Sequence, residues 1–153
     1  MQQYHLNLLQ TFNAMRIFLD IYFEQHESAD IATILGSLQL CMPYNNNPLQ
    51  APTIDRAAWH DWINAVKKTL IAEGVNLTSQ TRFNTQQAYT CMLNYLELFY
   101  KKYHFEDVES LLILIHKMQH TLNDTLWQQW LLSINHAIND SYPLEVSFLQ
   151  IDK

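Results

Sequence analysis

Residues 14–23 read A-M-R-I-F-L-D-I-Y-F, and residues 91–100 read C-M-L-N-Y-L-E-L-F-Y. In both stretches large apolar side chains recur mostly at spacings of three and four, the period of one buried face of an α-helix. The apolar positions coincide when the second stretch is laid on the first with an offset of 77 residues. The matched pairs are Met15 with Met92, Phe18 with Tyr95, Leu19 with Leu96, and Tyr22 with Phe99.

The same periodicity continues on both sides of these stretches and predicts six helices. Ser28, Asp55 and Asn123 each stand just before such a pattern, where a short polar side chain can cap the first turn of a helix. The expected helices cover about residues 6–23, 28–40, 55–73, 84–100, 106–121 and 123–138.

The third and sixth helices match each other at a smaller offset of 68, which pairs Trp59 with Trp127 and Trp62 with Trp130. The first copy therefore carries an insertion of nine residues within the proline- and asparagine-rich loop from Cys41 to Ile54. The four tryptophans are interpreted as core anchors, because large aromatic side chains three residues apart share one helical face.

We therefore predict an all-α fold in which residues 1–153 form a single domain. About six helices make two related three-helix units in a compact bundle, with a possible internal repeat over residues 7–74 and 80–140. The alternative is that two generic three-helix patterns fall into step by chance. The tail, residues 141–153, is expected to form a short extended segment or to lie over a helical groove.

Composition excludes several classes of function. Two isolated glycines cannot build a phosphate-binding loop, a dinucleotide fingerprint or a nucleophile elbow. A net charge of −6 argues against binding to nucleic acid or to an anionic membrane. No apolar run is long enough to span a membrane, and no export signal is recognised, so a cytoplasmic protein with reduced Cys41 and Cys91 is expected.

No constellation of residues indicates an enzyme, a cofactor or a metal site. His116 and His120 lie four apart on one predicted helix, but Lys117 stands where a catalytic zinc helix carries glutamate. A metal or small molecule bound by these histidines stays as a minor alternative. We expect no catalytic residues, no cofactor and no metal.

An acidic segment near the first interhelical turn is the leading candidate for contact with a partner. Asp20, Glu24 and Glu27 lie where negative charge opposes the dipole of the preceding helix, whereas the position equivalent to Glu24 is Lys101. The preference for positive charge at the end of a helix is violated in the first half of the chain and obeyed in the second. Such an exception marks a candidate functional site. We predict a contact surface for a basic partner made of Asp20, Glu24, Glu27 and Asp30, the alternative being a solvated face that also serves the next helix.

Tyr44 completes the predicted site. It lies in the Cys41–Ile54 loop, where the two halves differ most, and tyrosine and asparagine suit adaptable recognition surfaces. A tolerated surface insertion is the alternative.

Three stretches resemble the small immunity proteins of bacterial polymorphic toxin systems, including contact-dependent growth inhibition. They are A-M-R-I-F-L-D-I-Y-F at 14–23, D-I-A-T-I-L-G-S-L-Q-L at 30–40, and D-R-A-A-W-H-D-W-I-N-A-V at 55–66, so the resemblance covers about residues 12–70. It implies a cytoplasmic, non-enzymatic protein that binds a cognate toxin domain, in some systems a nuclease, and occludes its active site. No binding residue is carried over, because such partners are specific to their own toxin. The alternative is an all-helical adaptor or regulatory module with another protein partner.

Overall fold

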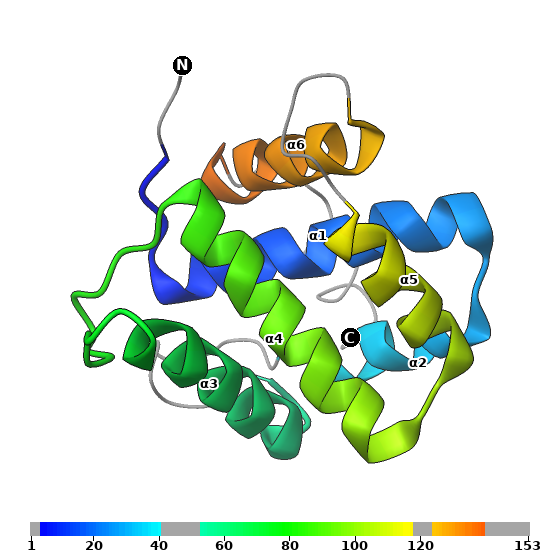
Figure 1. Cartoon of the computed structure of the whole chain (residues 1–153), viewed down its shortest axis with the longest axis horizontal. Helices are drawn as coiled ribbons and strands as arrows, with labels where there is room; N and C mark the ends of the chain where they lie inside the picture. The colour runs from blue at the N-terminus through cyan, green and yellow to red at the C-terminus, as the bar shows by residue number, and fades with distance from the viewer. Residues whose placement is uncertain (1–3, 41–52, 118–123, 140–153) are drawn as a thin grey trace, which may run out of the picture.

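A computed structural model describes residues 4–40, 53–117 and 124–139 (Figure 1). Within these residues the fold is all-α, as predicted, and its β-structure is limited to two isolated bridges. No described helix is long and apolar enough to cross a membrane. The six helices are α1 (Leu8–His26), α2 (Ala29–Ser37), α3 (Arg56–Ile71), α4 (Thr85–Tyr103), α5 (Glu106–His116) and α6 (Thr125–Asn139).

Helices α1 and α4 begin in the same way. The Asn7 side chain accepts a hydrogen bond from the backbone N–H of Gln10, while the Gln10 side chain accepts one from the backbone N–H of Asn7. Asn84 and Gln87 form the same reciprocal pair at the start of α4. Such a capping box satisfies two backbone donors that the helix itself leaves open.

The two helices also end in the same way. Each has 19 residues, and each stops at a residue other than glycine in the left-handed conformation. These residues are Glu27, with φ 49°, and His104, with φ 54°. The left-handed conformation costs a residue with a side chain about 1–2 kcal/mol, so the packing of the next helix must hold both turns in place.

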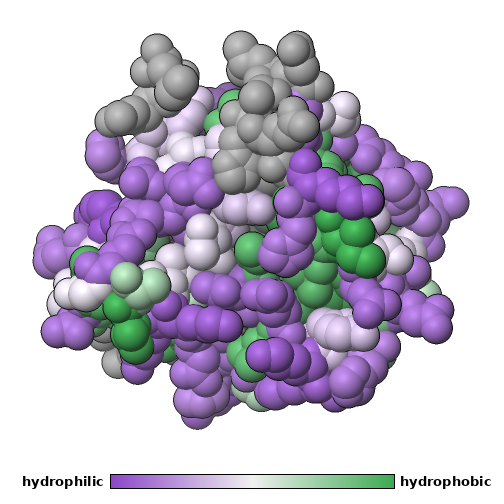
Figure 2. All heavy atoms as spheres, in the orientation of Figure 1, coloured by the Kyte–Doolittle hydropathy of each residue, from purple (hydrophilic) through white to green (hydrophobic). Residues whose placement is uncertain are grey.

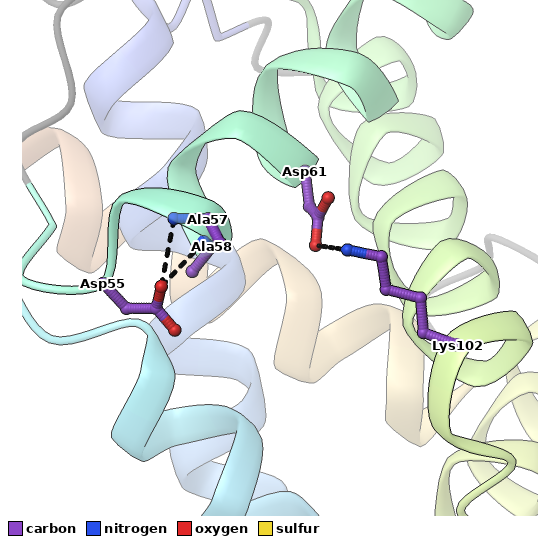
Figure 3. Close-up of polar contacts among 5 residues, drawn as sticks. All are labelled: Asp55, Ala57, Ala58, Asp61 and Lys102. Atoms are coloured by element: carbon purple, nitrogen blue, oxygen red, sulfur yellow. Dashed lines mark hydrogen bonds and ion pairs between the residues drawn. The ribbon is translucent and has the colours of Figure 1, made fainter.

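The caps of the shorter helices agree with the sequence at two positions and differ at a third. Ser28 accepts a hydrogen bond from Ile31, and Asp55 accepts from Ala57 and Ala58 (Figure 3). At the start of α6 the backbone N–H groups of Leu126 and Trp127 donate to the carboxylate of Asp124, at 3.0 and 3.2 Å. The predicted cap Asn123 lies outside the described residues, and Asp124 satisfies these two donors one position later.

The third helix of each half packs along the first helix of the other half. Helix α6 lies along α1, and α3 lies along α4; these are the two most extensive helix–helix contacts among the described elements (Figure 1). Helices α2 and α5 contact each other, and they also contact α1 and α4, respectively. The halves are therefore interlocked rather than packed as two separate bundles.

Aromatic side chains repeat this exchange in the core. Trp62 of α3 meets Tyr95 of α4 edge-to-face, with ring centroids 6.3 Å apart, and Trp130 of α6 meets Phe18 of α1 at 5.9 Å. The offsets of 77 and 68 residues convert one pair into the other. Trp59, Trp62 and Trp130 are buried, which confirms them as core anchors, while Trp127 is half-buried and packs against Tyr89 at 6.1 Å.

The start of each half pairs with the start of the other. The backbone N–H of Leu6 donates to the carbonyl of Phe83, and the N–H of Phe83 donates to the carbonyl of Leu6, both at 2.8 Å. Leu6 and Phe83 are themselves 77 residues apart and both fully buried. Reciprocal bonds between equivalent residues indicate an approximate two-fold axis that relates the halves.

Candidate functional site

The predicted acidic residues lie at the turn between α1 and α2. Glu24 is in the last turn of α1 and Glu27 is its C-cap, and both side chains are exposed. Asp20, one turn earlier than Glu24, is half-buried, and so is Asp30 in the first turn of α2. Glu24 and Glu27 are therefore the predicted residues that stand most open to a partner.

The approximate two-fold axis brings a second set of carboxylates to this turn. The side chain of Asp30 accepts a hydrogen bond from the backbone N–H of Asp107 at 3.1 Å, and the hydroxyl of Ser28 donates to the Asp107 carboxylate at 2.6 Å. In Figure 1 the starts of α2 and α5 lie near each other at the right. We call this surface the acidic corner; its residues are Glu24, Glu27, Asp30, Glu106 and Asp107.

The hydrogen bond of Asp30 gives it a structural role. Helix α5 has no side-chain cap of its own, because the residue before its first turn is Phe105. Asp30 supplies an acceptor to this open end from the other half of the chain. One alternative for the acidic segment was that its carboxylates stabilise the start of the next helix. Asp30 does so: it lies in the first turn of α2 and also accepts a hydrogen bond from the first turn of α5.

The contrast in charge between the two halves is present at the helix ends. The last turn of α4 carries Lys101 and Lys102, whereas His26 is the basic residue in the last turn of α1. Lys102 makes a further contact: its Nζ lies 2.7 Å from Oδ2 of Asp61 on α3 (Figure 3). This carboxylate raises the pKa of the Lys102 ammonium, and the pair joins the two halves at the surface.

Of the residues considered for other chemistry, the structure describes His116 and Cys91. Nε2 of His116 lies 3.9 Å from Oε2 of Glu97, and no three His, Cys, Asp or Glu side chains gather as metal ligands in residues 4–40, 53–117 and 124–139. Burial raises the pKa of the Cys91 thiol to about 12, so the thiol is not a nucleophile at neutral pH. His120 and Cys41 lie outside the described residues.

Tyr44 also lies outside the described residues, as does most of the loop to which it belongs. Of the predicted acidic residues, Glu24, Glu27 and Asp30 lie in the acidic corner, and Asp20 lies one turn earlier on α1. The predicted anchor in the loop stays a prediction.

An exposed apolar pair on α5 was missed by the sequence reasoning. Leu111, Leu112 and Ile115 are buried, but the residues between them, Ile113 and Leu114, keep 50% and 43% of their surface exposed. Figure 2 shows hydrophobic surface bordered by hydrophilic side chains on the face of the molecule where α5 lies. The signal was present in the sequence, because five consecutive aliphatic residues exceed what one buried face of a surface helix can accommodate.

Comparison with models of protein families, with curated proteins and with solved structures finds no match to this chain.

Proposed function

We propose that this chain is an immunity protein that neutralises a cognate bacterial toxin domain by stoichiometric binding. The observation that carries the proposal is the acidic corner, where the approximate two-fold axis joins carboxylates from both halves on one exposed edge. The resemblance of residues 12–70 to small immunity proteins supplies the class of partner.

Charge supports a basic partner. The chain carries a net charge of −6, and Glu24 and Glu27 sit where the dipole of α1 makes negative charge unfavourable. Each such charge costs about 0.3–1 kcal/mol of folding free energy at an exposed site. Within residues 4–40, 53–117 and 124–139, Glu24 makes no hydrogen bond or ion pair that would offset this cost. A role in binding a partner would account for the carboxylate of Glu24 at the C-terminal end of α1.

The mechanism that we propose is occlusion. A nuclease holds its substrate through lysine and arginine side chains in a cleft, and carboxylates of Glu24 and Glu27 can occupy the places of substrate phosphates. Complementary charge mainly accelerates association and selects the partner. Because salt screens such charges, the proposal also predicts that affinity for the toxin domain falls as the salt concentration rises. Tyr44, in the Cys41–Ile54 loop, is the proposed anchor.

The test is charge reversal, with binding to the toxin domain encoded beside this chain as the readout. Glu24→Lys combined with Glu27→Lys is expected to slow association about tenfold or more at low salt and to flatten the dependence on salt concentration. Folding stability is expected to hold or rise slightly, because lysine at these positions complements the dipole of α1.

A matched pair of variants separates this local effect from total charge. Glu24→Gln with Glu27→Gln changes the net charge by the same amount as Ser79→Lys with Gln80→Lys, which alters exposed residues between α3 and α4. Equal loss of binding in both would show that only net charge matters, and the acidic corner would then be a solvated face.

A further inference from the structure

The exposed pair Ile113 and Leu114 has no counterpart in the first half of the chain. At the offset of 77 residues their equivalents on α2 are Gly36 and Ser37. Three buried positions correspond at this offset: Ile31 with Val108, Ile34 with Leu111, and Leu38, directly after α2, with Ile115. A fourth buried residue of α5, Leu112, corresponds to Leu35, which is partly buried.

The fold does not explain this difference. A side-chain carbon placed on Gly36 would meet nothing within 4 Å, so the position is open to a larger residue. Conversely, Ile113 and Leu114 expose about half of their surface, while Leu111 and Ile115 on the same helix are fully buried. Two adjacent aliphatic side chains exposed on one of two equivalent helices make this face a candidate contact surface.

The apolar pair is continuous with the acidic corner. Ile113 follows Glu106 by seven residues, and Leu114 follows Asp107 by seven. Seven residues are about two turns, so each pair lies on one side of α5, separated by about 10 Å along the axis. The exposed side of α5 thus carries carboxylates at its beginning and aliphatic side chains toward its end.

We propose that this side of α5 is an anchor of the interface with the toxin domain, an inference that rests on the proposed function. Ile113 and Leu114 would fill an apolar depression of the partner, and Glu106 and Asp107 would receive its lysine or arginine side chains about 10 Å away. An apolar centre with charged residues at its edge is the usual anatomy of a specific interface.

The negative charge of the acidic corner favours a basic toxin domain over a second copy of the chain as the partner bound at α5. Two copies related by a two-fold axis would place the same patch against itself. Their acidic corners would then approach each other and repel, whereas a basic toxin domain complements the carboxylates at the beginning of α5.

The experiment uses the full-length chain and the purified toxin domain encoded beside it. Ile113→Gln with Leu114→Gln removes the apolar pair and keeps a good helix former at both positions. Ile71→Gln with Leu132→Gln is the matched control, because these side chains are 70% and 48% exposed on other helices. Affinity and off-rate are measured by surface plasmon resonance, and folding stability by urea denaturation.

The double variant on α5 is expected to bind about 10–100-fold more weakly, mostly through faster dissociation, while the control stays within about twofold. Both variants should match the unmodified chain in stability. If the α5 variant binds as tightly as the control, the inference is wrong and the proposed function stands. If the unmodified chain itself does not bind the toxin domain, the proposed function fails, and the inference fails with it.

One further outcome would overturn the inference. The unmodified chain could prove to be a dimer that the α5 variant, and not the control, dissociates. A second copy would then be the occupant of this surface.

Discussion

Trp62 and Trp130 occupy equivalent places in the core but differ in one hydrogen bond. Nε1 of Trp130 donates to the carbonyl of Thr85 at 3.2 Å, whereas Nε1 of Trp62 is buried and has no hydrogen-bond partner among the residues that the structure describes. Both side chains are fully buried. Replacing each tryptophan by phenylalanine therefore removes similar apolar volume but has a different polar consequence.

The magnitudes can be worked from this difference. Loss of the second ring costs each variant about 1 kcal/mol or more in packing. Trp130→Phe also loses a hydrogen bond worth about 1 kcal/mol, so its total destabilisation is about 2 kcal/mol. Trp62→Phe instead removes an unpaired buried donor, which returns about 1–3 kcal/mol and leaves a net change near zero or slightly stabilising.

The assay is urea denaturation of both variants, followed by far-ultraviolet circular dichroism because each variant loses a fluorophore. We expect Trp62→Phe to be the more stable of the two by about 2 kcal/mol or more, at unchanged dependence on urea. Equal destabilisation of both would refute the reasoning, since it would mean that the N–H of Trp62 is satisfied in the folded protein.

Two further predictions concern the caps and the buried thiol. Asn7→Ala and Asn84→Ala each remove a capping box, and each should lower the free energy of unfolding by about 1 kcal/mol in the same urea assay; a large inequality would contradict the equivalence of α1 and α4. The Cys91 thiol has its pKa raised from 9.0 to about 12 in the folded state, so above about pH 9 the unfolded chain releases a proton that the folded chain retains. Stability should therefore fall between pH 9 and 12, and Cys91→Ala should show a shallower fall; identical alkaline profiles would count against the burial of this thiol.

The sequence predicted the helices because their evidence is local. The apolar period around Met15 and Met92 predicts a buried face, and Ser28 and Asp55 are caps that act on their own first turn. Such interactions need no knowledge of the rest of the fold. The all-α fold with six helices followed from them.

The exchange of the third helices could not be predicted in the same way. Periodicity shows that Trp62 and Trp130 face a core but does not show which helix they meet there. The matched pattern of the two halves fits separate bundles and interlocked halves equally well, because both bury the same faces.

The candidate site could be predicted only where its signal is local. Glu24 and Glu27 were found because they conflict with the dipole of their own helix, which is a local signal. Asp30 and Asp107 are equivalent at the offset of 77 residues, yet no local pattern indicates that they contact each other. Residues near a two-fold axis contact their own equivalents, and this property emerges only once the halves are assembled.

Survival under co-expression tests the central proposal most directly. The toxin domain encoded beside this chain is induced in bacterial cells with the chain, without it, and with the Glu24→Lys, Glu27→Lys variant. The proposal predicts survival with the unmodified chain, recovery of a one-to-one complex from those cells, and weaker protection by the variant. Growth arrest with no complex would contradict it, and a complex without rescue would indicate an adaptor with a different role.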